Sequence, residues 1–190
     1  ATGLTSLARD LGGKRLQLLK EAFPQVAHVA FLSDPGDSGS IAQEKESRKS
    51  AEILKIRLTT IDLRQAADIE PAIKRGVALG VQAYVVPQVF LFNSNYQTTV
   101  DSMMRAKTPA IFGNDQAVHM GGLMSYSIDY QDNFRRAAAY VDKILKGAKP
   151  GDLPTEQPIK FKLAVNLKSA KAMGVKFPPS ILLQADKVIE

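Results

Sequence analysis

The sequence predicts an α/β fold in which a parallel sheet carries helices on both faces. Short apolar, β-branched runs alternate with amphipathic stretches, and this cycle repeats from residue 11 to residue 113. Parallel strands need helical crossovers, so the alternation implies a sheet buried on both sides. Right-handed crossovers then place the loops that follow the strands along one edge of the sheet, where ligands bind.

The individual elements follow from the apolar pattern and from turn-forming residues. The predicted strands are 28–33, 56–63, 82–87 and 109–113. The predicted helices are 11–23, ended by Pro24, and then 41–54, 67–79 and 93–106. Asn93 or Ser94 is expected to cap the last of these helices.

After Gly121-Gly122 the regular alternation of short strand-like and helix-like segments ends. An extended segment over 123–128 is followed by an amphipathic helix over 134–145 and a Gly- and Pro-rich connector. A strand over 160–166, a short helix over 169–173 and a helical segment from Pro178 to Glu190 complete the chain. Two sub-domains joined by more than one crossing would explain this change, and one domain with an appendage is the alternative.

Composition narrows the functional classes. The 190 residues are 45% hydrophobic and 23% charged, which is ordinary for a globular protein. The absence of cysteine excludes disulfides, thiolate zinc sites and cysteine nucleophiles, and two histidines argue against a histidine-rich metal site. The net charge of +6 is scattered among acidic residues, which indicates a solvated surface and no nucleic-acid partner. No stretch resembles a signal peptide or a membrane span.

The motif search favours binding over catalysis. The loop from Asp34 to Ser40 has two glycines but no phosphate-binding lysine, so it is read as a polar turn in which Ser38 and Ser40 could face a cleft. No G-x-S-x-G elbow is present. Asp115 and Asp129 could act as an acid–base pair, although an Asp near a helix start is more often a cap.

The segment from Gln88 to Asn93 has an unusual composition for a loop that follows a strand. Two phenylalanines and a leucine either plug the core beneath the next helix or form the apolar wall of a ligand pocket. Both interpretations stay open at this point. Tyr126, just after the double glycine, raises the same question.

Several stretches together carry a resemblance to one bacterial family. They are 2–5, 12–16, 121–126, 136–150, 152–158, 160–161, 165–171, 178–183 and 185–190. They resemble the ABC transporter substrate-binding proteins related to tryptophan- and other aromatic amino-acid-binding proteins. The resemblance implies a type I periplasmic binding protein with two Rossmann-like lobes, three crossings and a ligand in the cleft between the lobes.

Placed on that plan, residues 6–114 are expected to form the second lobe and 122–147 to return to the first lobe. Residues 148–159 would be the connector and hinge, and 160–190 would cross back. The family's first-lobe strands and its signal or lipoprotein segment normally precede the motif at 2–5, so the chain is expected to be truncated. The apolar face left uncovered could then pair two copies as a homodimer.

The resemblance implies an extracytoplasmic, periplasmic solute-binding component of an ABC importer that delivers a small molecule, such as an amino acid or related metabolite, to the membrane permease. It implies no catalytic residue, and we expect no cofactor and no metal. Ser127 stands where the family usually has Gly, and the loop after the third strand differs from the family's polar variants. An aromatic amino acid therefore does not carry over directly as the ligand. The expected ligand-facing residues are Ser38, Ser40, Gln88, Phe90, Asn93, Asn114 and Tyr126.

Two other functions are compatible with the same sheet. An effector-binding sensor or regulatory domain would use the same fold with a signalling or DNA-binding segment attached. An enzyme would use Asp115 or Asp129 as its acid or base.

Overall fold

Seven strands form one sheet in the order β3-β2-β4-β5-β6-β8-β9 in the computed structural model, which describes residues 2–5 and 11–190. The strands are β2 (His28–Ser33), β3 (Arg57–Asp62), β4 (Ala83–Val86), β5 (Ala110–Phe112), β6 (Met124–Ile128), β8 (Phe161–Asn166) and β9 (Lys187–Ile189). All neighbours are parallel except β6 and β8, which pair antiparallel. The predicted α/β class, with a mostly parallel sheet, is confirmed.

Helices cover both faces of this sheet because alternate strand residues point to opposite sides. On β2, Val29 and Phe31 belong to one apolar cluster, while Ala30 and Leu32 belong to the other. The first cluster is closed by α1 (Leu11–Ala22), α2 (Ser38–Leu54), α8 (Leu167–Met173) and α9 (Pro179–Gln184). The second is closed by α3 (Ile69–Ala78), α4 (Phe90–Asn93), α5 (Tyr96–Ala106) and α6 (Gln116–His119). A short 3-10 turn (Ala66–Asp68) leads into α3.

Two glycines let α1 and α2 approach closely. A Cβ atom on Gly12 would lie 2.2 Å from the backbone oxygen of Gln43, and one on Gly13 would lie 2.4 Å from Ser50 Oγ. The clash at Gly12 is with backbone, so the contact between these helices requires glycine there, whereas at Gly13 the Ser50 side chain would have to move. This close approach brings the side chain of Gln43 next to α1.

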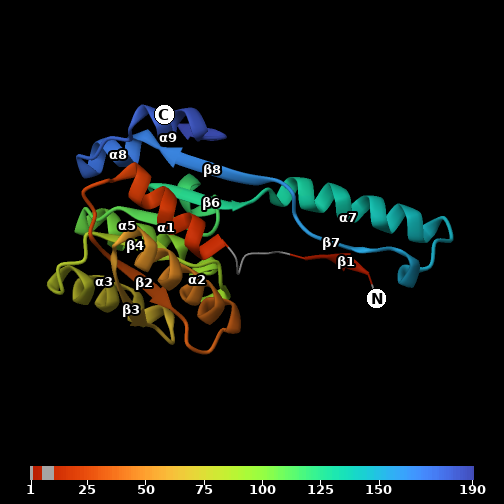
Figure 1. Ribbon diagram of the computed structural model, residues 1–190, viewed down its shortest axis with the longest axis horizontal. Coiled ribbons are helices and arrows are strands. Elements are labelled where there is room, and N and C mark those ends of the chain that lie inside the picture. The colour runs from red at the N-terminus through yellow and green to blue at the C-terminus, as the bar shows by residue number, and fades with distance from the viewer. Residues whose placement is uncertain (1, 6–10) are drawn as a thin grey trace.

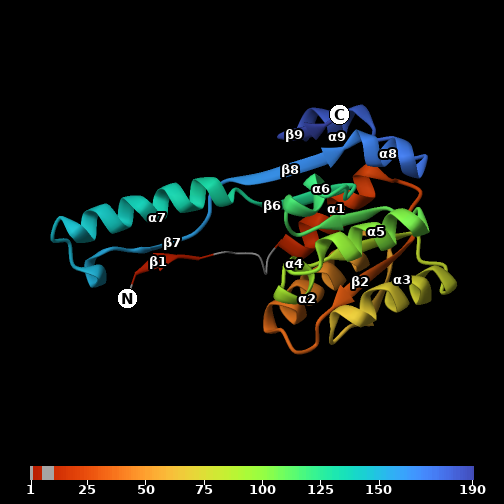
Figure 2. The same ribbon diagram turned by 180° about the vertical axis from the view of Figure 1, so that it is seen from behind.

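An arm projects from the sheet and its helices (Figures 1 and 2). It consists of β1 (Gly3–Leu4), α7 (Tyr130–Leu145), a 3-10 turn (Pro150–Asp152) and β7 (Thr155–Glu156), with β1 and β7 paired in parallel. Tyr140 of α7 is buried against this pair, and its hydroxyl donates to Glu156 Oε1 at 2.7 Å. Arg136 forms an ion pair with the same carboxylate. The N-terminal end of the chain lies on the arm, and the C-terminal end lies on the other part.

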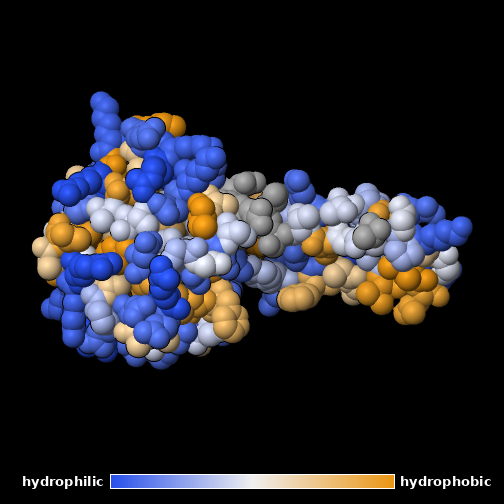
Figure 3. Space-filling view, turned by 90° about the horizontal axis from the view of Figure 1, so that it is seen from below, coloured by the Kyte–Doolittle hydropathy of each residue, from blue (hydrophilic) through white to orange (hydrophobic). Residues whose placement is uncertain are grey.

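One face of α7 is apolar and uncovered. Phe134, Val141 and Leu145 are 73%, 56% and 82% exposed, at spacings that place them on the same side of a helix. Figure 3 shows this apolar surface along the arm. Among the described residues, no helix is both long enough and apolar enough to cross a membrane.

Several element boundaries differ from the prediction. The segment read as a loop before residue 93 is helical at α4, and Asn95 rather than Asn93 or Ser94 precedes α5. The end of the chain, predicted to be helical to Glu190, forms the edge strand β9. Helix α7 begins four residues earlier than expected because Asp129 caps it, its Oδ1 accepting from Asp132 N at 3.1 Å.

The predicted lobe boundaries agree only in part with the division between the large sheet and the arm. Residues 11–114 lie in the part built on the large sheet, while 6–10 lie outside the described residues. The range 122–147, expected to return to the first lobe, includes β6, which lies in the large sheet. The chain leaves this sheet after Ile128 and re-enters it at Phe161. Assignment of the arm to a first lobe stays a prediction.

Substitution of Gly12 by Ala should destabilise the protein by about 1 to 3 kcal/mol, because the new methyl group forces α1 away from the backbone of α2. Urea unfolding of the purified chain would measure this change. Gly151→Ala is the matched control, since a Cβ there meets nothing within 4 Å. Equal stability of the two variants would contradict the close-packing role of Gly12.

Candidate functional site

The loops that follow β2, β4, β5 and β6 meet at one edge of the sheet because these strands are parallel. The loop after β2 leads into α2, and the loop after β4 contains Gln88. The loop after β5 contains Asn114, and the end of β6 runs into Tyr130 at the start of α7. This edge is where the arm joins the sheet (Figure 1), so it is the candidate ligand site.

A fully buried arginine lies beneath this edge. Arg15 of α1 is 0% exposed. Its Nε donates to the backbone oxygen of Tyr126 at 2.8 Å, and its Nη2 donates to the backbone oxygen of Gly113 at 3.4 Å. Its Nη1 donates to Gln43 Oε1 at 2.6 Å. One guanidinium therefore joins α1 to the ends of β5 and β6 and to α2.

No carboxylate among the described residues forms an ion pair with Arg15. Burial lowers the pKa of Arg15 to about 10, while the nearby hydroxyl of Tyr130 acts in the opposite direction. The group therefore stays charged at neutral pH. Burial also raises the pKa of Tyr130 to about 12, so this hydroxyl stays protonated and can donate a hydrogen bond.

Gln88 extends this network to the arm. Its backbone N–H donates to Gln43 Oε1 at 3.3 Å, and its side-chain Nε2 is hydrogen-bonded to the hydroxyl of Tyr130. The remaining side-chain atom, Oε1, is buried and finds no hydrogen-bond partner among the described residues. A buried acceptor without a partner costs about 1 to 3 kcal/mol, so a ligand or water that donates to it would be stabilised there.

The other residues predicted to face the ligand divide by exposure. Ser38 is exposed at the first turn of α2. Ser40 is 0% exposed, and its Oγ accepts from Asp34 N at 2.9 Å, so its hydroxyl supports the loop. The two phenylalanines of this segment differ. Phe92 is buried in the core, as the core-plug interpretation predicts, whereas Phe90 is 81% exposed.

Asn93, Asn114 and Tyr126 have local partners. Asn93 Oδ1 accepts from the hydroxyl of Tyr96 at 2.5 Å, and Asn114 Oδ1 accepts from Gln116 N at 2.9 Å. Tyr126 is half-buried, with its ring stacked on Phe161 at a centroid distance of 6.0 Å. Contact between these side chains and a ligand stays a prediction.

A polar cavity of about 280 Å³ lies beside the same edge. Asp115 and His119 contribute from one side, and Asp129 and Lys162 from the other. The Asp129 carboxylate caps α7 and pairs with Lys162 Nζ at 2.9 Å. The capping interpretation of Asp129 is thus the one that the contacts favour over an acid–base role.

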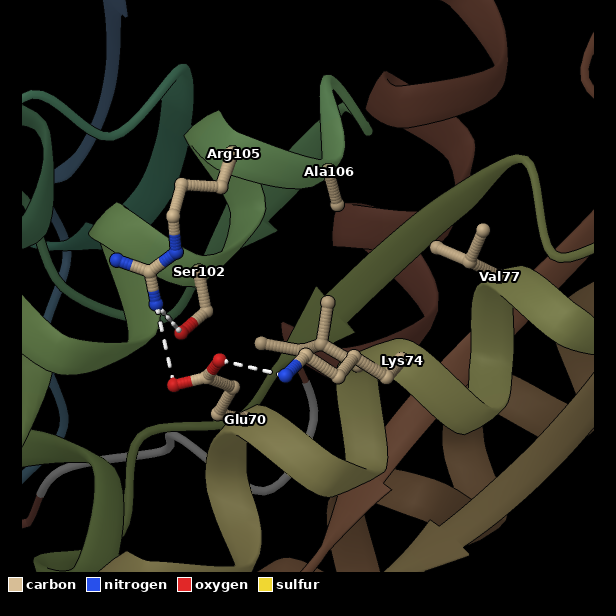
Figure 4. A pocket seen from close by; sticks show the side chains of 7 residues that line it. Glu70, Lys74, Val77, Ser102, Arg105 and Ala106 are labelled. Atoms are coloured by element: carbon tan, nitrogen blue, oxygen red, sulfur yellow. Dashed lines mark hydrogen bonds and ion pairs between the residues drawn. The ribbon is translucent and has the colours of Figure 1, made fainter.

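A second cavity, of about 460 Å³, lies between α3 and α5 and contains none of the predicted residues (Figure 4). At the rim of this cavity, the Glu70 carboxylate forms ion pairs with Lys74 Nζ at 2.9 Å and with Arg105 Nη2 at 3.3 Å. Exposed ion pairs of this kind contribute little to stability. The cavity is an ordinary groove between two helices.

Three residues of the edge network, Arg15, Gln43 and Tyr130, were not predicted. Arg15 carries a signal in the sequence, because it occupies a helix face otherwise formed by Leu11, Leu18 and Ala22. A charged residue on such a face needs buried partners. Its partners are two backbone oxygens and one amide, which no sequence pattern specifies.

Comparison with known proteins identifies the family and the fold of the chain. The family model described as ABC transporter substrate binding protein matches residues 2–189. The chain belongs to this family. The family is one of solute-binding proteins. A search of curated proteins gives no match.

Solved structures of other proteins share the fold. A conserved domain protein from Vibrio cholerae is 24% identical, with a TM-score of 0.86 over 98% of this chain and 62% of its own. An ABC domain from Streptococcus pneumonia in complex with L-Trp is 26% identical, with a TM-score of 0.83 over 99% of this chain and 64% of its own. This substrate-binding family member therefore spans less than two thirds of either relative.

The same fold also occurs in regulators. A LacI family transcriptional regulator from Bifidobacterium animalis is 13% identical, with a TM-score of 0.64 over 82% of this chain and 59% of its own. This likeness shows the fold alone. It is consistent with the type I periplasmic binding protein architecture that the resemblance implied.

Acid should loosen the start of α7. The hydrogen bond from Lys162 lowers the pKa of Asp129 below its ordinary value of 3.8. The ionised Asp129 carboxylate therefore contributes fully to stability above pH 3.8, and this contribution is lost as the pH falls through the lowered pKa. The protection of the amides of residues 130–133, expressed relative to the intrinsic exchange rate at each pH, would measure this loss between pH 7 and pH 3.

In Asp129→Asn the same amides should be less protected at pH 7 and respond less to acid. Asp152→Asn, at an exposed position of the arm, serves as the matched control. An unchanged pH response in Asp129→Asn would contradict the assignment.

Proposed function

We propose that this chain contributes one ligand-binding lobe and the hinge to an extracytoplasmic solute-binding protein of an ABC importer. The observation that carries the proposal is the buried, unpartnered Oε1 of Gln88 at the carboxyl edge of the sheet. Family membership supports solute binding, and it is the reason for proposing that the solute passes to an ABC permease. Such a protein acts in the periplasm or outside the cell.

The ligand we propose is an amino acid or a related small metabolite. The relative from Streptococcus pneumonia binds L-Trp. In this chain Gln88 offers a hydrogen-bond acceptor, and the exposed ring of Phe90 on the adjoining turn offers apolar surface. This combination suits a molecule with a polar donor at one end and an apolar body. Tyr126, Asn93, Asn114 and Ser38 remain candidates for further contacts.

The arm belongs, in this proposal, to the first lobe of the complete protein. Among the residues that the structure describes, no further strand pairs with β1 or β7, and the helix of the arm leaves Phe134 and Leu145 exposed. Two-stranded units of this size need additional strands to be stable. In this proposal the crossings lie at 129–130 and 160, and the segment 148–159, which contains the 3-10 turn and β7 of the arm, connects α7 to the second crossing. None of the comparisons supports the homodimer expected from the exposed apolar face.

An effector-binding regulatory domain is the second candidate, favoured by the shared fold with LacI family regulators. A DNA-binding or signalling domain in the complete reading frame would establish this alternative. A lipoprotein or secretion signal would establish the importer component.

The complete protein that carries this chain should be stabilised by its ligand without turnover. At a ligand concentration a hundredfold above Kd, linkage predicts about 2.7 kcal/mol of stabilisation. Thermal unfolding with L-tryptophan and the other amino acids would measure it, and Gln88→Ala should weaken binding at least tenfold. Gln25→Ala, at an exposed position, is the control. Absence of any stabilising ligand would exclude the proposed ligand class.

The lobe assignment makes its own prediction for Phe134→Ala. In the complete protein this substitution should cost about 3 to 5 kcal/mol, the value for a buried phenylalanine. In the 190-residue chain, where the ring is 73% exposed, it should change stability by only about 0.5 kcal/mol. Denaturant unfolding of both forms, with Arg135→Ala as control, would separate these values. Equal effects in both forms would exclude a covering lobe.

A further inference from the structure

Gln43 makes four polar contacts although it lies in the middle of a helix and is only 1% exposed. Its Oε1 accepts from Arg15 Nη1 at 2.6 Å and from Gln88 N at 3.3 Å. Its Nε2 donates to the backbone oxygens of Gly39 at 3.1 Å and Gln88 at 3.4 Å. The carboxamide is thus used as an acceptor on one side and a donor on the other.

These contacts hold both polar groups of the Gln88 backbone. The N–H and the C=O of this one residue are bound to the same side chain. The direction of the Gln88 side chain, which reaches Tyr130 and leaves Oε1 unpartnered, therefore depends on Gln43. Arg15 in turn orients the Gln43 amide, because a guanidinium can only donate and requires the oxygen to face it.

We infer that Gln43 is a positioning residue for ligand binding, which holds Gln88 in the orientation that meets the ligand and the arm. The inference rests on the proposed function, since it assigns a role at the same site. Gln43 itself is buried beneath the edge and acts through Gln88. A preorganised contact raises affinity because its ordering is complete before the ligand arrives.

The substitution Gln43→Glu distinguishes positioning from support of the fold. A carboxylate still accepts from Arg15 and gives this buried guanidinium an opposite charge. Its second oxygen, however, replaces the donor that faces the carbonyls of Gly39 and Gln88, and three acceptors then meet without a hydrogen atom. The new charge pair with Arg15 offsets the cost of these unmatched acceptors, so the stability of the protein should be kept or raised, while the backbone at Gln88 is pushed from its place.

The experiment uses the complete protein and L-tryptophan as the probe. We expect Gln43→Glu to bind at least tenfold more weakly than the native protein, with an equal or higher melting temperature. Without ligand, hydrogen exchange in the segment 87–93, where every residue except Pro87 carries an amide hydrogen, should be at least tenfold faster in Gln43→Glu than in the native protein. Gln25→Glu adds the same charge at an exposed position and should change neither property.

Each outcome decides a separate question. Native affinity in Gln43→Glu, or unchanged exchange in 87–93, would overturn the positioning role. If native protein binds no amino acid, the proposed ligand class fails, and the exchange measurement still decides the role of Gln43. If Gln43→Glu does not fold, Gln43→Met removes the same contacts without adding charge, and faster exchange confined to 87–93 is again the expected result. Uniformly faster exchange across the sheet would assign Gln43 to the fold alone.

Discussion

The structure at the carboxyl edge of the sheet depends on the burial of one positive charge, that of Arg15. A guanidinium removed from water must have its donors satisfied, and here the acceptors are the ends of two strands and one amide. These acceptors exist only if α1 lies close to α2 and beneath β5 and β6. The glycines at positions 12 and 13 permit that approach, so the packing of two helices and the geometry of the edge are one constraint.

The edge is shared between the sheet and the arm. Tyr130 is the first residue of α7, and its hydroxyl contacts Gln88 of the loop after β4. Asp129 and Lys162, on the outgoing and returning segments, are joined by an ion pair. A movement of the arm relative to the sheet would therefore change the hydrogen bond between Tyr130 and Gln88. Hinge motion around a ligand works through a few such residues at element ends.

The apolar segment after β4 illustrates how one sequence feature serves two purposes. Phe92 fills the core beneath α4 and anchors the turn, while Phe90, two residues earlier, faces outward. A four-residue helical turn places residues of this spacing on different sides, which an extended loop would not do in the same way. The core and the exposed surface of the segment are thus supplied by neighbouring residues.

The sequence by itself determined the α/β class, the positions of the main strands and the family. Apolar alternation and the family motifs are local properties, and a parallel sheet needs little more than this pattern. It also pointed to Gln88 through the unusual loop in which it lies. Only the tertiary structure decided that Arg15, Gln43 and Tyr130 meet there, that Ser40 is internal, and that the last residues form β9. The meeting of Arg15, Gln43 and Tyr130 depends on contacts between residues 28 to 111 positions apart, such as Arg15 with Gln43 and Tyr126, and no local pattern encodes such contacts.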